Sequence, residues 1–288
     1  MLQINDITKL YGLNQGIQNV SFQLNKGEVC AIIGHNGSGK STLFKSLLGL
    51  IQLDSGKILF DEKPIQTLMM GYLPENRSVI QDLKTTDLIE LVAKLKRLNN
   101  EELVLMRDYW MKVLDCESLK SKQLKQCSKG NQQKIQLICA LIHSPKVVIL
   151  DEPFSGLDIE NTRLFQKVIT KLKKQGKIVL LSSHRFEEIE HLCDYICVIK
   201  ESRVIMQGTL MDIKEKVNKQ TVTLSNDASV FYKDEKGVVD IIRDGNLTHY
   251  IFENEKLCAR ASKAMITERG LKSIKISSLT LDDLFEQS

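Results

Sequence analysis

The chain has 288 residues, of which 42% are hydrophobic and 26% charged, a balance typical of a globular protein with one large or two modest domains. Its 40 basic and 36 acidic side chains leave a formal net charge of +4, too small to indicate a nucleic-acid partner. No apolar run approaches the roughly 20 residues that a membrane-spanning helix needs, and residues 1–10 show no signal-peptide pattern, so we expect a cytosolic protein.

Two segments near the amino terminus alternate between apolar and polar residues. They cover residues 2–5 and 20–24, and the alternation predicts antiparallel strands with one solvated face. Tyr11 and Gly12 lie between the two segments. The Tyr11 ring is a candidate for stacking on a purine base, and packing of the ring on the sheet is an equally good interpretation.

A glycine-rich segment follows a short apolar run over residues 28–33, which predicts a buried strand. The segment fits G-x-x-x-x-G-K-[ST], and its residues are Gly34, His35, Asn36, Gly37, Ser38, Gly39, Lys40, Ser41 and Thr42. After it, Leu43, Phe44, Leu47 and Leu48 fall on one face of a predicted helix. Strand, glycine loop and helix in this order predict a phosphate-binding loop.

The chemistry of this loop predicts a nucleoside triphosphate with Mg²⁺ as its ligand. Glycines let successive backbone N–H groups point at phosphate oxygens, and the helix N-terminus adds a favourable dipole. Lys40 supplies a mobile positive charge for the β- and γ-phosphates. Ser41 offers a hydroxyl to Mg²⁺, and Thr42 adds a second hydroxyl near the α-phosphate.

A long helical region separates two groups of predicted strands. Residues 56–60 and 70–74 predict strands before it, and residues 147–150 predict the next buried strand after it. Between them, residues 87–95 and 101–115 carry apolar residues at helical spacing. We therefore expect a helical insertion between two halves of a parallel α/β core.

Ionisable side chains follow two of the predicted parallel strands. Asp151 and Glu152 follow the strand at residues 147–150, and His184 follows an apolar strand at residues 178–183. Ligands of open α/β sheets bind at the carboxyl edge of such strands. Asp151 is therefore a candidate ligand of Mg²⁺, Glu152 a candidate base for the attacking water, and His184 a candidate contact of the γ-phosphate.

One segment resembles the L-S-G-G-Q signature of the ATP-binding subunits of ABC transporters. It consists of Cys127, Ser128, Lys129, Gly130, Asn131, Gln132 and Gln133, with cysteine in the usual place of leucine. Other motifs occur in the family's order: the adenine-stacking aromatic at Tyr11, Walker A at residues 34–42, Walker B at residues 147–151 with Glu152 behind it, the D-loop at residues 155–158 and the switch histidine at His184. From these motifs the chain is identified as a member of this family.

The resemblance implies a fold, an activity and partners. The fold is an α/β P-loop NTPase core with an antiparallel β subdomain and a helical insertion at about residues 78–145, within an ATP-binding domain of residues 1–218. The activity is ATP hydrolysis coupled to transport, with Glu152, His184 and Lys40 as catalytic residues and ATP and Mg²⁺ as cofactors. The implied partners are a separate membrane permease at the inner face of the plasma membrane and a second ATP-binding subunit, without nucleic acid.

The signature also implies how two subunits share a nucleotide. Ser128 and Gly130 begin a predicted helix, and a helix N-terminus is an anion site. In the family this end faces the γ-phosphate held by the other subunit's phosphate loop. We therefore expect ATP to be bound at a head-to-tail interface of a homodimer or heterodimer, which opens after hydrolysis.

One residue departs from the family pattern. After the strand at residues 70–74 the family carries glutamine, whereas this chain has Glu75, a form similar to that of bacterial sodium, drug and antibiotic exporters. A glutamate oxygen can reach Mg²⁺ or its water, and a third acid beside Asp151 and Glu152 favours metal binding. The alternative is a loop acid that forms a salt bridge with Arg77.

Residues 219–288 differ in pattern from the preceding part of the chain. Strand-like runs and one predicted helix alternate there, at residues 221–224, 238–242, 248–252, 256–267 and 272–276. They predict a small accessory α+β domain, which the exporter branch often carries. No group of residues in it predicts chemistry, so we expect a packing or regulatory role.

Two classes of function account for these features. The first is the ATPase subunit of a transporter, with export implied by the resemblance to the exporter branch. The second is a soluble ABC ATPase that acts on ribosomes or DNA. Such relatives generally carry two ATPase halves, zinc insertions or long coiled arms, whereas this chain has one phosphate loop and neither zinc spacing nor a long heptad stretch. The sequence therefore favours transport.

Overall fold

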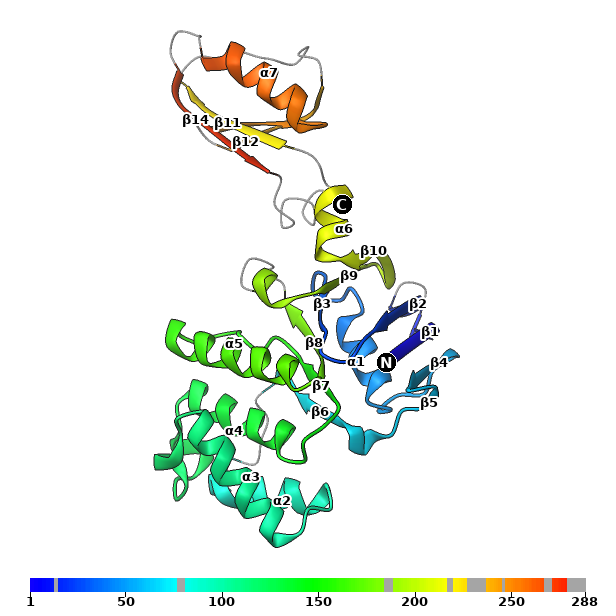
Figure 1. The fold of residues 1–288 in the computed structure, drawn as a ribbon, viewed down its shortest axis with the longest axis vertical. Coiled ribbons are helices and arrows are strands. Elements are labelled where there is room, and N and C mark those ends of the chain that lie inside the picture. The colour runs from blue at the N-terminus through cyan, green and yellow to red at the C-terminus, as the bar shows by residue number, and fades with distance from the viewer. Residues whose placement is uncertain are drawn as a thin grey trace. The chain divides into compact units, whose positions relative to one another are not determined.

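The computed structural model describes residues 1–12, 15–76, 81–183, 189–216, 220–226, 237–244, 247–266 and 271–278 (Figure 1). The chain forms two units, Met1–Leu210 and Met211–Ser288. The sequence places the domain boundary at residue 218, whereas the two units divide near the start of helix α6 (Leu210–Lys216).

Ten strands of the first unit, counted over its described residues, form one sheet in the order β5-β4-β1-β2-β10-β9-β3-β8-β7-β6. Their bounds are β1 (Leu2–Leu10), β2 (Gly16–Leu24), β3 (Val29–Ile33), β4 (Ser55–Phe60), β5 (Lys63–Pro64), β6 (Met70–Leu73), β7 (Val147–Leu150), β8 (Ile178–Ser183), β9 (Tyr195–Lys200) and β10 (Arg203–Thr209). β1 pairs antiparallel with β2 and β4, whereas β3, β6, β7, β8 and β9 form parallel pairs. The predicted α/β class is confirmed, with an antiparallel part and a parallel core in one sheet.

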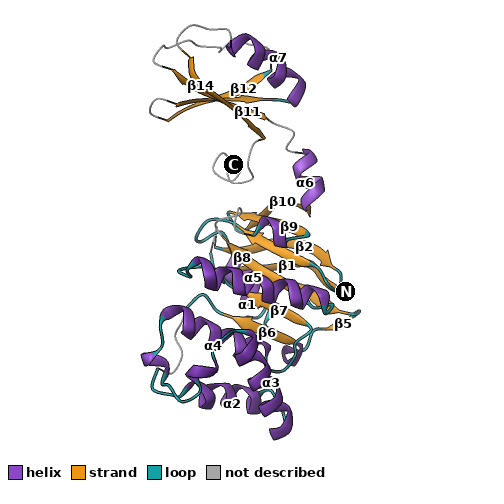
Figure 2. Cartoon of the chain, turned by 60° about the vertical axis from the view of Figure 1, so that its left-hand side comes forward, coloured by secondary structure: helices purple, strands orange, loops and turns teal. Residues whose placement is uncertain are grey.

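Helices lie on the faces and at one edge of this sheet (Figure 2). Their bounds are α1 (Lys40–Leu47), α2 (Thr85–Leu95), α3 (Asn100–Val113), α4 (Lys129–Leu141) and α5 (Ile159–Lys174), with 3₁₀ turns at Thr67–Met69, Glu117–Leu119, Leu124–Gln126 and Glu190–Leu192. Helices α2, α3 and α4 form the predicted insertion between β6 and β7. Over the described part of the chain, none of the helices combines the length and apolar character needed to cross a bilayer.

Local sequence fixes the start of helix α3. The Asn99 side chain accepts a hydrogen bond from the backbone N–H of Glu102 at 2.9 Å, and the Glu102 carboxylate accepts one from the Asn99 N–H at 3.0 Å. This capping box satisfies two backbone donors that the helix would otherwise leave unpaired. Trp110 and Met111 of the same helix are buried.

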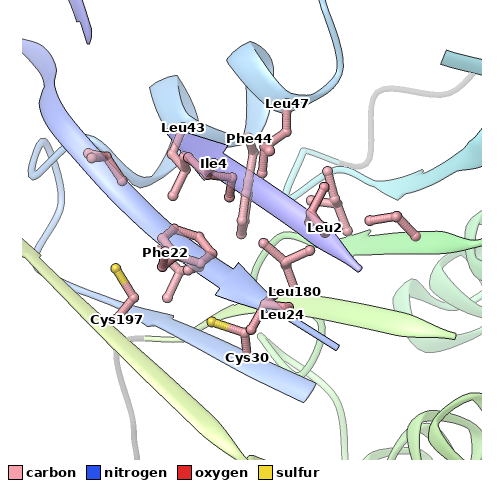
Figure 3. Close-up of a cluster of buried hydrophobic side chains, with 14 of the residues drawn as sticks. Leu2, Ile4, Phe22, Leu24, Cys30, Leu43, Phe44, Leu47, Leu180 and Cys197 are labelled. Carbon is pink, nitrogen blue, oxygen red and sulfur yellow. The ribbon is translucent and has the colours of Figure 1, made fainter. Parts of the chain in front are cut away.

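Helix α1 packs its apolar face against the antiparallel strands (Figure 3). Leu43, Phe44 and Leu47 of α1 are at most 1% exposed and belong to one cluster with Ile4 of β1 and Phe22 of β2. Burial of each such side chain contributes about 1.5–3 kcal/mol. The glycine loop between β3 and α1 is therefore held by buried elements on both sides.

The described strands of the second unit form a separate sheet in the order β12-β13-β11-β14. Their bounds, with those of the helix, are β11 (Gln220–Asn226), β12 (Val238–Asp244), β13 (Leu247–Phe252), α7 (Glu255–Ile266) and β14 (Leu271–Ser278). All pairs are antiparallel. Cys258, Ala261 and Met265 of α7 pack on Tyr250 and Phe252 of β13. This arrangement confirms the predicted small α+β unit.

Candidate active site

The carboxyl ends of four parallel strands meet at one edge of the sheet. Ile33 of β3 pairs with Ser183 of β8, and Leu150 of β7 pairs with Leu181 of β8 and Leu73 of β6. The segments that leave these strands therefore emerge side by side, as the sequence predicts. They are the glycine loop after β3, Asp151 and Glu152 after β7, and Pro74 and Glu75 after β6.

Glycines shape the loop between β3 and α1. Gly37 and Gly39 have φ angles of 83° and 118°, in the left-handed region that residues with a side chain rarely adopt. A Cβ atom at Gly39 would lie 2.3 Å from the carbonyl oxygen of Gly16, and one at Gly34 would lie 2.3 Å from that of Ile199. The loop backbone therefore approaches its neighbours too closely for a side chain at these positions.

Lys40 begins α1, and its side chain bends back over the loop. Its Nζ donates hydrogen bonds to the backbone carbonyls of Gly34 and His35, the latter at 3.2 Å. Burial lowers the pKa of Lys40, and the nearby carboxylates of Glu152 and Asp151 act in the opposite direction. The ammonium group therefore lies between the loop and the acid pair that follows β7.

This acid pair is buried at the end of β7. Asp151 is 5% and Glu152 9% exposed. Glu152 has a φ of 48°, a left-handed conformation that costs a non-glycine residue on the order of 1 kcal/mol. The hydroxyl of Ser182 on β8 donates to Asp151 Oδ1 and accepts from the backbone N–H of Glu152, both at 2.7 Å. The turn that carries both acids is therefore fixed from the neighbouring strand.

A cavity of about 310 Å³ brings the loop and the acids together. Its lining residues are Tyr11, Gln15, Gly16, His35, Asn36, Gly37, Gly39, Lys40, Ser41, Thr42, Glu75, Asp151 and Glu152. The volume lies in the range of small-ligand sites. Sequence reasoning missed Gln15 and Gly16, although glycines on both sides of Gln15 indicate a turn there. The Gln15 carbonyl accepts a hydrogen bond from the Tyr11 N–H at 2.9 Å.

Two predicted site residues lie at the rim of this cavity, and a third, His184, falls outside the described residues. Tyr11, just after β1, is 55% exposed, and Glu75 is also exposed. Both line the cavity. Arg77 and His184 lie outside the described residues. The salt bridge between Glu75 and Arg77 and the γ-phosphate contact of His184 therefore stay predictions.

Known proteins share both the sequence and the fold of this chain. A family model described as ABC transporter matches residues 17–155. YhaQ of Bacillus subtilis, an ABC transporter ATP-binding protein, is 31% identical over 99% of this chain and 97% of its own length. The chain belongs to the family of ABC transporter ATP-binding proteins. As a member it is the ATP-binding, ATP-hydrolysing subunit of a transport system.

Two further proteins extend the comparison of this ABC ATPase. The lantibiotic transport ATP-binding protein SrtF of Streptococcus pyogenes is 31% identical over 72% of this chain and 90% of its own length. The solved structure of CbiO1 from Clostridium perfringens, part of the ABC transporter complex CbiONQ, aligns with a TM-score of 0.65 and 28% identity. This alignment covers 75% of the ABC ATPase and 94% of CbiO1.

The signature segment of the ABC ATPase lies outside the cavity of its own chain. The Ser128 hydroxyl caps α4 by accepting the backbone N–H of Asn131 at 3.3 Å. Ser128 is exposed and Gly130 is half-buried, and neither lines the cavity. A Cβ atom at Gly130 would lie 3.1 Å from the Nδ2 atom of Asn161 on α5. The helix end is therefore open to another molecule.

A buried amide connects α4 of the ABC ATPase to the acid pair. Gln133 is 4% exposed, and its Nε2 donates to the backbone carbonyl of Pro153 at 2.8 Å. Pro153 directly follows Glu152. Sequence reasoning assigned no separate role to Gln133 or Ser182. Two features of the sequence could have indicated them. Gln133 is a polar residue on the buried face of a predicted helix, and Ser182 carries a hydroxyl at the end of an apolar strand.

Proposed function

We propose that this ABC ATPase binds ATP with Mg²⁺ in the cavity at the sheet edge and hydrolyses it there to power export. The observation that carries the proposal is the meeting of the glycine loop, Asp151, Glu152 and Tyr11 around one cavity. The loop's backbone N–H groups and Lys40 bind the phosphates, with Thr42 near the α-phosphate. The exposed ring of Tyr11 stacks on the adenine.

The oxygen atoms that line the cavity fit Mg²⁺. Ser41 offers a hydroxyl, Asp151 a buried carboxylate and Glu75 a second carboxylate. Mg²⁺ is usually held by one or two carboxylates together with waters and substrate phosphates. Within the described ranges no cluster of three or more His, Cys, Asp or Glu side chains offers a protein-only metal cage. When bound, Mg²⁺ supplies positive charge that neutralises phosphate oxygens.

Glu152 acts on the attacking water. Its carboxylate lines the cavity, where it orients the water and accepts its proton. Lys40 stabilises the negative charge that develops on the phosphate oxygens. His184, which follows Ser183 in the sequence and lies outside the described residues, is the proposed contact of the γ-phosphate. The buried positions of Lys40 and Glu152 support this division of roles, because burial strengthens electrostatic interactions.

A second ATP-binding subunit, identical or related, completes each nucleotide site. The exposed Ser128 and the half-buried Gly130 at the N-terminus of α4 support this, because they lie outside their own chain's cavity. A helix N-terminus with a hydroxyl attracts phosphate. ATP is therefore bound between the glycine loop of one subunit and the signature end of the other, and its hydrolysis lets them separate.

The transport partner is a membrane permease, and the ATPase works at the inner face of the plasma membrane without a nucleic-acid partner. SrtF is a lantibiotic transport ATP-binding protein and CbiO1 is part of a transporter complex, which supports a chain that works with other subunits. The exporter-like Glu75 and the C-terminal α+β unit support export as the direction. Residues 1–218 supply the ATPase, and residues 219–288 a packing or regulatory accessory.

The Glu152→Gln variant tests the proposed function. We expect it to bind ATP as the wild type does, to lose turnover by on the order of 10²-fold or more, and to accumulate as an ATP-bound dimer. Full-length protein is assayed for phosphate release, for binding of a fluorescent ATP analogue and for mass by light scattering. Glu101→Gln, at an exposed carboxylate in the first turn of α3, is the matched control. Hydrolysis by Glu152→Gln at close to the wild-type rate would contradict the role of Glu152.

A further inference from the structure

Ser182 is a buried polar residue in an otherwise apolar stretch of β8. The preceding residues, Ile178 to Leu181, are 0% exposed and apolar, and Ser182 is itself 0% exposed. A buried hydroxyl costs free energy unless it is hydrogen-bonded. β8 lies between β3, which leads into the phosphate loop, and β7, which leads into the acid pair. Ser182 therefore lies at the centre of the site's edge.

One hydroxyl group fixes both acids that follow β7. The Ser182 Oγ donates to Asp151 Oδ1 at 2.7 Å, a short hydrogen bond of the charge-assisted kind. The same Oγ accepts the backbone N–H of Glu152 at 2.7 Å. Glu152 has the left-handed φ of 48°, so this bond supports a turn that the backbone alone disfavours. One atom, the Ser182 Oγ, therefore contacts both the Asp151 carboxylate and the Glu152 backbone.

Tyr72 contacts the same carboxylate from the other side. It lies on β6, the neighbour of β7 opposite to β8. Burial, together with the charge of Asp151 and a hydrogen bond to it, raises the pKa of Tyr72 to about 12. The Tyr72 phenol therefore stays protonated and is the donor of this hydrogen bond to the Asp151 carboxylate. With hydroxyl groups on both sides, the carboxylate has little freedom to turn.

We propose that Ser182 is a positioning residue of the ATPase reaction, which holds the Asp151 carboxylate towards Mg²⁺ and the Glu152 backbone in its productive turn. The proposal rests on the roles proposed above for Asp151 and Glu152. It adds a residue, two positions before His184 in the sequence, that does not line the cavity. Its removal leaves the buried Glu152 N–H without this acceptor and takes from Asp151 one of the hydroxyl groups that restrain its carboxylate.

The Ser182→Ala variant of the full chain tests the proposal with two readouts. The first is the binding of Mn²⁺, as a probe for Mg²⁺, to the protein with ATP, followed by electron paramagnetic resonance. The second is the phosphate-release rate as a function of Mg²⁺ concentration. We expect metal affinity and turnover to fall roughly 10- to 100-fold, the usual effect of losing a residue that orients a metal ligand. Binding of a fluorescent ATP analogue without metal should be unchanged.

Three further variants make the outcomes distinguishable. Ser262→Ala removes another buried hydroxyl, bonded to the Cys258 carbonyl at 2.6 Å in the second unit, and should leave metal affinity unchanged. Ser182→Cys fills the space of serine with a weak hydrogen-bond donor, and replaces Ser182→Ala if that variant does not fold. Asp151→Asn reports on the proposed function itself.

Each result decides one question. If Asp151→Asn loses metal affinity and Ser182→Ala keeps it, the inference about Ser182 is wrong and the proposed function stands. If Asp151→Asn also keeps wild-type metal affinity, the proposed role of Asp151 is wrong. If Ser182→Ala weakens metal-free ATP binding as much as metal binding, Ser182 has a general structural role and the proposal is again overturned.

Discussion

His143 is surrounded by groups that keep its imidazole neutral. Its Nε2 lies 3.0 Å from the Met70 carbonyl, which can only accept, so Nε2 carries the proton. Nδ1 is buried and has no hydrogen-bond partner within the described ranges. The Lys96 ammonium donates to the same carbonyl at 3.3 Å. Burial and the charges of Lys96 and Lys177 lower the pKa of His143 to about 4, although the hydrogen bond to the Met70 carbonyl raises it.

This shift predicts a pH dependence of stability. The folded pKa of about 4 lies below the usual value of 6.5, so the unfolded chain binds more protons between these limits. The contribution of neutral His143 is therefore complete above pH 6.5 and is lost as the pH falls towards 4. Since the group is partly exposed, we expect a loss of about 1–2 kcal/mol. The measurement is urea unfolding of the wild type and of His143→Gln at pH 4.5 and 7.5. Parallel pH profiles of the two proteins would contradict it.

Helix α4 joins two functional parts of the ATPase. Its N-terminus at Ser128 is exposed, while Gln133 on its buried side donates to the Pro153 carbonyl next to Glu152. Because α4 is a continuous helix, a displacement of its N-terminus at Ser128 can be transmitted through Gln133 to Pro153 and the adjacent acid pair. Gln136, one turn further along the same helix, is 4% exposed, and among the described residues neither of its amide atoms has a hydrogen-bond partner.

These two glutamines form a matched pair for mutagenesis. Gln133→Leu leaves the Pro153 carbonyl without this donor, so we expect a loss of about 1–3 kcal/mol in the free energy of unfolding, with a lower kcat and little change in KM. Gln136→Leu removes an amide that no group in the described part of the chain hydrogen-bonds, and should leave stability unchanged or higher. The measurements are chemical denaturation and steady-state ATP hydrolysis. Equal destabilisation by the two substitutions would show that the bond to Pro153 is not the cause.

Local patterns predict the elements of this protein better than the bonds between them. The glycine loop, the acids after β7 and the capping box of α3 each depend on residues close in sequence, and the structure contains these local features. The bonds of Ser182 to Asp151 and of Gln133 to Pro153 join residues that are distant in the chain. They depend on the order of β7 and β8 and on the packing of α4, which no local pattern specifies. The left-handed conformation of Glu152 is likewise a product of the tertiary structure.

In the whole first unit, the glycine loop and the signature end occupy different places. The cavity is lined by the loop and the acids of one chain, whereas Ser128 is exposed outside it. A nucleotide that contacts both Lys40 and Ser128 must therefore join two copies. In a symmetric pair, Lys40 of each copy would act with Ser128 of the other, so each pair would contain two equivalent sites.

Mixing two inactive variants tests this division of labour. Lys40→Ala removes the ammonium group proposed to bind phosphate, and Ser128→Glu places a negative charge where the partner's γ-phosphate would lie under this proposal, so each variant alone should be inactive. In a mixed dimer, one site has both defects and the other has neither. We expect an equal mixture to regain about a quarter of wild-type ATP hydrolysis, because half of randomly formed dimers are mixed and each has one intact site of two. The measurement is phosphate release after the purified variants are combined. If Lys40 and Ser128 instead acted within one chain, every copy in the mixture would carry a defect in its own site, and activity would stay at the level of the single variants.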